Sequence, residues 1–219
     1  RAAGGCRRQR GTCAAAVNPW PQGYARREWT EIDSTNEEAR RLAASGERGP
    51  IWLRADSQTA GRGRRGRAWE SPAGNLAATL LIAPGKPASE CAQLSFVTAI
   101  AAADTASSFA PNTEIKVKWP NDVLANGRKL SGILLESASG GDGALTFLAI
   151  GIGMNLAHFP PDTEFPATSL AALGVSVPSA SAALTQLAAH FAKWYELWMS
   201  SGFSPIHDAW LARAAGLCT

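Results

Sequence analysis

The chain has 219 residues, of which 46% are hydrophobic and 18% charged, a composition typical of a folded globular protein rather than a disordered one. That length suits one domain with a substantial core. The formal net charge of +3 argues against a dedicated nucleic-acid-binding protein. The longest apolar runs are shorter than the ~20 residues that a membrane-spanning helix needs, so we expect no contact with a membrane.

The four cysteines and three histidines are scattered, without the spacing of a metal site or of a disulfide framework. We therefore expect free thiols in a reducing compartment, which predicts a cytoplasmic protein, and no structural metal.

Residues 1–23 show no hydrophobic periodicity, and we expect an unstructured tail there. Ser34 and Thr35 each precede a glutamate by three residues, the spacing of a capping box, which predicts a helix ending near residue 45. Apolar patterns predict further strands and helices. The strands are expected at 51–55, 76–83, 115–119, 130–136 and 144–152, the last two joined by a turn at 139–143, and the helices at 90–109 and 180–199.

This order of elements predicts an α+β fold with a mixed, mainly antiparallel sheet covered by helices. The pattern favours helices on one side of that sheet.

The stretch GRGRRGRAW at residues 61–69 has the glycine spacing of a dinucleotide-binding turn. Pro72 and the turn residues around it cannot open the long helix that such a turn requires, so we reject that interpretation. Glycines interleaved with arginines suit a loop that grips phosphate, and we expect it to be disordered until it closes on a ligand. A solvated basic loop and a grip on single-stranded nucleic acid remain alternatives, although Trp69 is the only aromatic residue nearby for base stacking.

Two further motifs carry polar chemistry. KWPND at residues 118–122 ends a predicted strand and is followed by RKLSG at 128–132. GIGMN at 151–155 places glycines inside a strand pattern, where they often mark the close approach of a ligand or of backbone. A polar hairpin alone would not explain why Lys118, Asp122 and Lys129 gather here.

DSTN at residues 33–36, the arginine loop, KWPND followed by RKLSGIL, and GIGMN, in this order, resemble the biotin protein ligases. The similarity covers about residues 24–200. It implies the class II synthetase-like fold of biotin and lipoate ligases, and a reaction in which biotin and Mg²⁺-ATP give biotinyl-5′-AMP. Biotin then passes to one lysine of a biotin carboxyl carrier protein or domain.

The resemblance also implies roles for individual residues. The catalytic residues would be Lys129, Arg64 and Asp122, with Asp122 holding Mg²⁺ or orienting the acceptor lysine. The biotin site would comprise Ser34, Thr35, Asn36, Gln58, Arg62, Gly63, Arg64, Lys129, Gly132, Gly151 and Gly153. The nucleotide site would comprise Arg64, Arg67, Trp69, Lys118, Asn121 and Asn155. The glycines are expected to let ligand and backbone pack closely.

Residues 1–23 are too short for the DNA-binding domain that some relatives carry, so we expect no DNA binding. Residues 201–219 resemble the helix that leads into a small SH3-like barrel, and we expect that barrel to be absent or truncated. Family members often pair through the central sheet, which is compatible with a homodimer. A lipoyl or octanoyl ligase or transferase of the same fold, a nucleic-acid-binding module and an inactive scaffold remain the alternatives.

Overall fold

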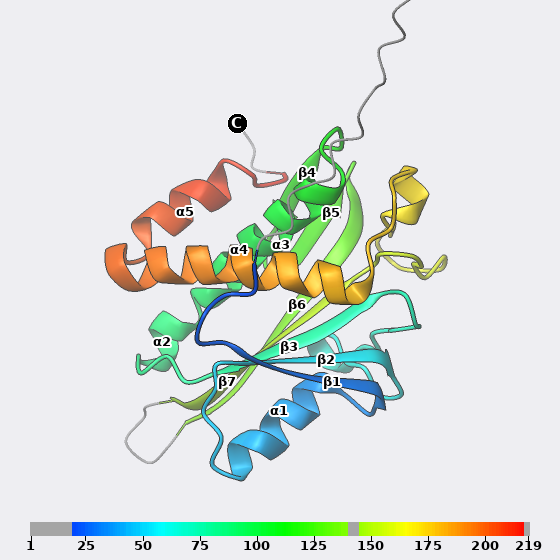
Figure 1. Cartoon of the computed structure of the whole chain (residues 1–219). Helices are drawn as coiled ribbons and strands as arrows, with labels where there is room; N and C mark the ends of the chain where they lie inside the picture. Colours follow the sequence, from blue (N-terminus) through cyan, green and yellow to red (C-terminus); the bar gives the residue numbers. More distant parts are fainter. Residues whose placement is uncertain (1–18, 140–144, 217–219) are drawn as a thin grey trace, which may run out of the picture.

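The computed structural model describes residues 19–139 and 145–216, and of Ser139 only the backbone. One seven-stranded sheet runs through it in the order β1-β2-β3-β7-β6-β5-β4 (Figure 1). Neighbouring strands are antiparallel except for the parallel pair β1 and β2, so the predicted mixed, mainly antiparallel sheet is confirmed. The strands are β1 (Ala25–Ile32), β2 (Ile51–Gln58), β3 (Leu76–Ile82), β4 (Ile115–Lys118), β5 (Asp122–Ala125), β6 (Arg128–Ser139) and β7 (Leu145–Met154).

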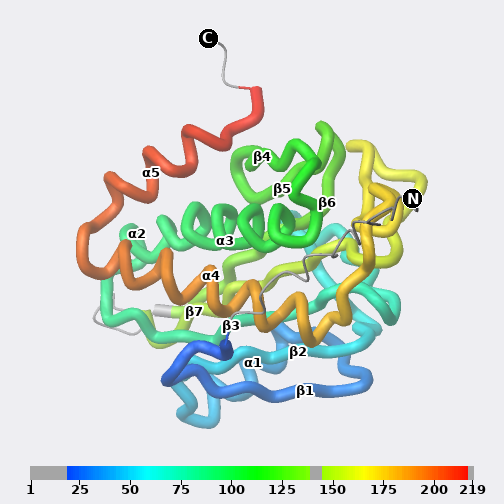
Figure 2. Tube along the Cα trace, turned by 45° about the horizontal axis from the view of Figure 1, so that its top comes forward, coloured from blue at the N-terminus to red at the C-terminus, as the bar shows by residue number. Residues whose placement is uncertain are grey.

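Five α-helices accompany the sheet in the described residues. They are α1 (Thr35–Ala44), α2 (Ala88–Cys91), α3 (Leu94–Phe109), α4 (Ala180–Ser201) and α5 (Ser204–Leu211). Helices α3 and α4 cross one face of the sheet side by side, while α1 lies on the other side (Figures 1 and 2). The helix predicted from Thr35 is confirmed, with Ser34 as its N-cap.

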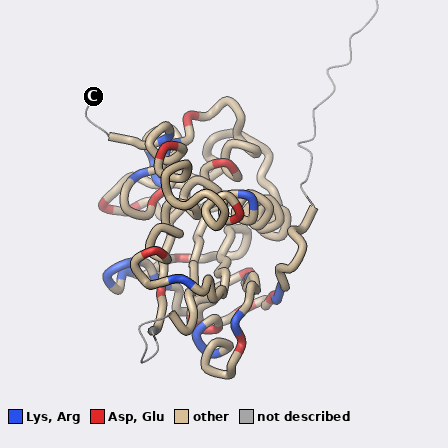
Figure 3. Tube along the Cα trace, turned by 90° about the vertical axis from the view of Figure 1, so that its left-hand side faces the viewer, with Lys and Arg blue, Asp and Glu red and all other residues tan. Residues whose placement is uncertain are grey.

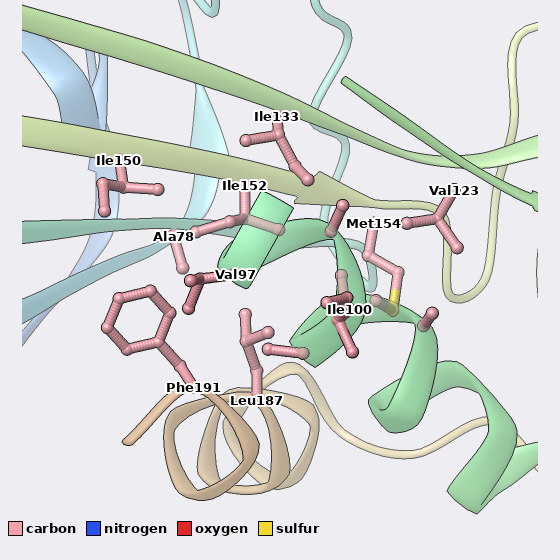
Figure 4. Packing of buried hydrophobic residues seen from close by; sticks show 14 of the residues in the cluster. Ala78, Val97, Ile100, Val123, Ile133, Ile150, Ile152, Met154, Leu187 and Phe191 are labelled. Atoms are coloured by element: carbon pink, nitrogen blue, oxygen red, sulfur yellow. The ribbon is translucent and has the colours of Figure 1, made fainter. Parts of the chain in front are cut away.

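The main core lies between the sheet and the α3–α4 layer. Helix α3 is apolar on nearly every side and buried almost throughout, as expected of a helix covered by both sheet and helix. Leu187 and Phe191 of α4 point toward Val97 of α3 and Ile152 of β7 (Figure 4). The stripe predicted on α4 therefore faces the core.

Helix α1 corrects the expectation that helices cover only one face. Ala39 and Ala43 of α1 pack in a second buried cluster with Leu53, Leu81 and Ala149, which alternate along their strands with residues of the main core. The cause is the parallel pairing of β1 with β2, because two parallel strands need a connection that crosses over a face of the sheet. Helix α1 is that connection.

Strand β1 was not predicted, because its exposed edge carries charged side chains in place of an apolar alternation. Asp122 begins a strand where a turn was expected, and the strand expected to reach Trp119 ends at Lys118, leaving Trp119 63% exposed. Residues 1–18 of the tail predicted at 1–23, and most of the turn at 139–143, lie outside the described residues. The end of that predicted tail is ordered by packing, since Trp20 lies against the main core and its Nε1 donates to Tyr24 O (2.7 Å).

The segment after residue 200 also differs from a free linker. Ile206 and Trp210 of α5 are buried in the main core. Beyond α5 the chain pairs with β4, since Val117 N–H donates to Arg213 O (2.9 Å) and Ala215 N–H donates to Val117 O (2.8 Å). The packed unit therefore continues past residue 200 to at least Ala215.

Candidate active site

A cavity of about 780 Å³ opens on the face of the sheet that also carries α1. The register places Gly151 and Gly153 on the same face as Ala149, which packs against α1. Of the predicted site residues, the cavity lining includes Ser34, Thr35, Asn36, Gln58, Arg62, Gly63, Arg64, Arg67, Trp69, Asn121, Asp122, Lys129, Gly132, Gly151, Gly153 and Asn155. Lys118 is the one predicted residue outside that lining.

The arginine loop forms a compact hairpin rather than the disordered segment that was expected. Gly63 N–H donates to Arg67 O (2.7 Å) and Trp69 N–H donates to Gly61 O (2.9 Å), which closes the loop across its base. A single 3₁₀ turn over Arg64–Gly66 forms its tip. These backbone bonds hold the loop at the rim of the cavity while leaving the Arg64 side chain exposed.

Cationic groups from two distant segments meet in this cavity. Lys129, at the start of β6, places its Nζ 2.6 Å from Asp122 Oδ1 at the start of β5. Arg64 reaches the neighbouring Asn121, whose Oδ1 lies 3.4 Å from the Arg64 guanidinium. The β5–β6 hairpin thus presents an ammonium group and the arginine loop presents a guanidinium group to one space, an arrangement suited to two anionic groups.

A buried polar network also borders the cavity. Gln58 Oε1 accepts from Thr35 N–H (2.8 Å), and Gln58 Nε2 donates to Ser71 Oγ (2.9 Å). Thr79 Oγ1, fully buried in β3, lies 2.8 Å from Thr35 Oγ1 and donates to Asn36 Oδ1 (2.6 Å). Thr35 and Gln58 are therefore fixed by uncharged partners, and the part of the cavity that they line is polar and neutral.

Two carboxylates fasten the arginine loop to this network. Arg62 forms ion pairs with Glu37 (2.5 Å) and Glu136 (3.7 Å), while Glu136 also accepts from Asn36 Nδ2 (2.6 Å). Hydrogen bonds from Arg40 and then from Arg62 lower the pKa of Glu37 below its usual value. Arg62 is thus neutralised by protein carboxylates, which suits a role in holding the loop.

The predicted glycines accommodate protein side chains as well as lining the cavity. A Cβ atom at Gly153 would overlap the indole of Trp69, and one at Gly132 would lie 2.9 Å from the same ring. At Gly151 a Cβ atom would overlap the side chain of Asn36. A group does approach the backbone closely at each of these glycines, as inferred, and in this structure the group is the side chain of Trp69 or Asn36.

The remaining predicted residues surround the same space. Arg67 pairs with Glu164 (3.0 Å) at an exposed position. The Lys118 ammonium lies 3.4 Å from the ring centroid of Phe165, a cavity-lining residue. Asn155 is buried, and its Nδ2 donates to Thr168 O (3.0 Å).

One lining segment was not predicted from the sequence. Residues between 160 and 167, which follow β7, contribute Pro160, Asp162, Thr163, Glu164, Phe165 and Ala167 to the cavity. The segment has no apolar periodicity and no motif of its own. Its only signal is its position directly after GIGMN, which becomes informative once β7 is known to end at the cavity.

Comparisons with known proteins agree with this geometry. Residues 31–155 match the model of the Biotin/lipoate A/B protein ligase family. The chain is 46% identical over 192 residues to the biotin–[acetyl-CoA-carboxylase] ligase of Paracoccus denitrificans, covering 84% of this chain and 79% of that relative. The chain belongs to the biotin/lipoate A/B protein ligase family.

Other members of the biotin/lipoate A/B protein ligase family are longer. The chain is 34% identical over 193 residues to the bifunctional ligase/repressor BirA of Bacillus spizizenii, covering 86% of this chain but 59% of that protein. Among solved structures, the biotin protein ligase of Aquifex aeolicus in complex with biotin and ATP superposes with a TM-score of 0.76 at 26% identity. That superposition covers 88% of this chain and 79% of that one.

No group of three or more His, Cys, Asp or Glu residues that could hold a metal ion occurs at 19–139 or 145–216. Mg²⁺ is commonly bound through one or two carboxylates together with substrate phosphates, so Asp122 alone would suffice for a magnesium ion that arrives with a nucleotide. Within the same residues, no helix is both long and apolar enough to cross a bilayer. Basic and acidic positions are interspersed over the trace (Figure 3).

Proposed function

We propose that this protein activates biotin with ATP to give biotinyl-5′-AMP, and then transfers biotin to a lysine of a biotin carboxyl carrier protein or domain. The observation that carries the proposal is the convergence of Lys129 and Arg64 on one cavity, next to a neutral polar pocket. Membership of the family and the 46% identity to a biotin–[acetyl-CoA-carboxylase] ligase support the choice of substrate.

In this proposal the neutral end of the cavity binds the ureido ring of biotin. Ser34, Thr35 and Gln58 offer hydroxyl, amide and backbone groups there. Thr35 N–H donates to Gln58, Gln58 donates to Ser71, and the Ser34 hydroxyl accepts from Glu37 N–H, so all three are held in fixed orientations. A neutral ureido group requires such uncharged donors and acceptors, because an unpaired charge beside it would be left poorly solvated.

The activation step has an electrostatic barrier that the cationic groups reduce. A carboxylate oxygen of biotin must attack the α-phosphorus of ATP, forming a C(O)–O–P bond while pyrophosphate leaves. Two unit charges 4 Å apart repel by about 4 kcal/mol at an effective dielectric constant near 20. The Lys129 ammonium and the Arg64 guanidinium would offset this repulsion and stabilise the charge that develops on the phosphate.

The pair between Lys129 and Asp122 suggests how the second step proceeds. When Lys129 moves toward the anionic ligand, the Asp122 carboxylate becomes free to accept a hydrogen bond from the incoming lysine amine. That amine attacks the acyl carbon and forms the amide C–N bond, the C–O bond to the phosphate breaks so that AMP leaves, and the amine proton passes to the Asp122 carboxylate and from there to solvent. Asp122 is also the residue that would hold a Mg²⁺ ion entering with ATP, where the ion would reduce the negative charge of the phosphates.

The proposal extends to the remaining features expected from the sequence. Residues 24–200 would form the catalytic domain, continued by the packed segment up to Ala215. The nucleotide end would include Arg67, Trp69, Lys118, Asn121 and Asn155. The partner would be the carrier domain of a biotin-dependent carboxylase in the cytoplasm, and a homodimer is compatible with the proposal.

The test is incubation with biotin, Mg²⁺-ATP and a purified carrier domain, read out by mass spectrometry of that domain. We expect a mass increase of one biotinyl group and release of pyrophosphate. Pyrophosphate release with lipoate or octanoate, and none with biotin, would instead identify a lipoyl or octanoyl enzyme. Salt-dependent binding of single-stranded nucleic acid that biotinyl-5′-AMP does not reduce would favour a nucleic-acid-binding role for the arginine loop.

A further inference from the structure

Asn75 makes an unusual set of hydrogen bonds just before β3. Its Oδ1 accepts from three consecutive backbone N–H groups, those of Leu156 (3.1 Å), Ala157 (3.0 Å) and His158 (3.0 Å). Its Nδ2 donates to the carbonyl of His158 (3.0 Å). Asn75 is 4% exposed, so water cannot easily replace these bonds.

The residue before Asn75 is shaped for the same contact. Gly74 has φ +97°, a backbone conformation that is energetically unfavourable for any residue other than glycine. A Cβ atom at Gly74 would lie 3.2 Å from Ala157 Cβ. Gly74 and Asn75 therefore form a turn that fits the backbone at 156–158, about eighty residues away in the sequence.

The backbone that Asn75 binds is also where both ends of the loop at 156–169 meet. Leu170 N–H donates to Asn155 O (3.1 Å) and Ala171 N–H donates to Leu156 O (2.9 Å). The side chain of Asn155 donates to Thr168 O (3.0 Å). Asn75 thus fixes the base of a closed loop rather than one point on a free segment.

That loop in turn holds residues of the candidate site. Lys129 N–H donates to Pro166 O (2.8 Å), and Thr168 N–H donates to Lys129 O (2.9 Å). The side chains of the loop contact Arg67 through Glu164 and Lys118 through Phe165. The loop therefore lies against the residues assigned to nucleotide binding and against the backbone of Lys129.

We propose that Asn75 is a positioning residue for the nucleotide end of the site, acting through the loop that it anchors. Asn75 does not line the cavity, and it acts on ATP only through the backbone at 156–158. The inference rests on the proposed function for the identity of the ligand. It assigns Asn75 to ATP binding and turnover, and not to the binding of the biotin ring. Within the described residues the loop contacts Lys129, Arg67 and Lys118, and no hydrogen bond joins it to Thr35 or Gln58.

The test compares Asn75→Ala, Asn75→Asp and a control. Asn75→Ala removes all four hydrogen bonds. Asn75→Asp has nearly the same shape and keeps the acceptor for the three N–H groups, but it turns an oxygen toward the carbonyl of His158. Leu187→Ala, in the core contact of α4, is the control for a general loss of stability. All variants are assayed at a temperature where circular dichroism shows them folded.

We expect kcat/KM for ATP to fall about 10²-fold in Asn75→Ala, the loss that a misplacement of about 1 Å can cause, and less in Asn75→Asp. The dissociation constant for biotin alone should stay within twofold of the parent value, on the order of assay error. Leu187→Ala should change neither kcat/KM for ATP nor the dissociation constant for biotin. Binding of a non-hydrolysable ATP analogue, measured by calorimetry, should weaken in the same order as turnover.

Hydrogen exchange at the amides of residues 156–158 provides a readout that does not depend on the reaction. Exchange there should accelerate in Asn75→Ala but not in Leu187→Ala. Unchanged exchange and unchanged ATP affinity in a folded Asn75→Ala would overturn the inference, as would an equal loss of biotin and ATP affinity. If the parent protein fails to adenylate biotin, the proposed function fails, while the exchange and ATP-analogue arms still decide the role of Asn75.

Discussion

The indole ring of Trp69 lies against Gly153, so closely that a Cβ atom at position 153 would overlap the ring. Gly132, which is paired with Gly153 across β6 and β7, faces the same ring. Two neighbouring strands thus both carry glycine at the position that faces Trp69, and the indole ring packs on their backbone. The ring also lies 5.6 Å from Lys129 Nζ, so its position affects the cationic centre.

Gly153→Ala is therefore expected to displace Trp69 and to reduce adenylate formation by about 10²-fold, since small displacements of positioning groups are costly. The assay is pyrophosphate release with biotin and Mg²⁺-ATP. Shortening the ring in the double variant Gly153→Ala/Trp69→Phe should recover part of the lost rate. A single Gly153→Ala variant with parent activity would show that the contact has no functional role.

Lys129→Ala should lower the rate of biotinyl-5′-AMP formation by about 10²–10³-fold, the usual effect of removing one preorganised group that stabilises developing charge. Arg128→Ala removes the adjacent, exposed cation and serves as the control, with the rate expected to stay near that of the parent. Thermal unfolding monitored by circular dichroism checks that both variants fold. Adenylate formation at the parent rate in Lys129→Ala would refute the assigned role.

Arg64→Ala should allow the bound adenylate to escape, because we propose that the exposed guanidinium at the loop tip, next to Asn121, binds the phosphate. Loss of one charge-assisted hydrogen bond of about 1.5–3 kcal/mol predicts dissociation roughly 10- to 100-fold faster. A chase experiment with labelled biotinyl-5′-AMP measures this rate. Arg128→Ala is again the control, and an unchanged rate in Arg64→Ala would contradict the prediction.

Thr79→Val should weaken biotin binding although Thr79 lies beneath the cavity. Valine keeps the shape of threonine but removes the hydroxyl that donates to Asn36 Oδ1 and contacts Thr35 Oγ1, leaving Thr35 Oγ1 with Gln58 Oε1 alone. We expect a loss of about 1–3 kcal/mol in the free energy of unfolding and a higher dissociation constant for biotin. Thr79→Ser retains the hydroxyl group and should preserve biotin affinity; equal affinity in all three proteins would count against the network.

His190 predicts a pH dependence of stability. Burial lowers the pKa of His190 below its ordinary value of 6.5; Asp104 opposes that shift and Lys193 adds to it. Because the folded state takes up this proton less readily than the unfolded state, stability is fully present above pH 6.5 and declines as pH falls toward the lowered pKa. In His190→Gln, chemical denaturation from about pH 7 to about pH 5 should show a shallower decline.

Local sequence patterns predicted much of the fold because they record burial. The apolar stripe of α4 and the capping residue Ser34 lie where the sequence indicated. Strand β1 escaped prediction because an edge strand carries charges that interrupt apolar alternation. The sequence also did not predict which face of the sheet α1 covers. That placement depends on the parallel pairing of β1 with β2, which no local pattern specifies.

For the site, the motifs identified the cationic and polar residues, and the structure brings them around one cavity. They did not identify Thr79, Glu136 or Asn75, because these residues act on other protein groups and stand outside any motif. The sequence also did not show what packs against the glycines. A glycine inside a strand indicates that some group approaches the backbone closely, and only the tertiary structure shows that the groups are Trp69 and Asn36.

The sequence by itself determined the family, the chemical types in the site and most of the elements, because these follow from the order of residues along the chain. The tertiary structure decided which groups meet. Lys129 faces Asp122, Arg62 is held between two carboxylates, and Asn75 anchors a loop some eighty residues away. Such contacts arise from strand register and from the crossover of α1, and these are set by the packing of the whole sheet rather than by any short segment.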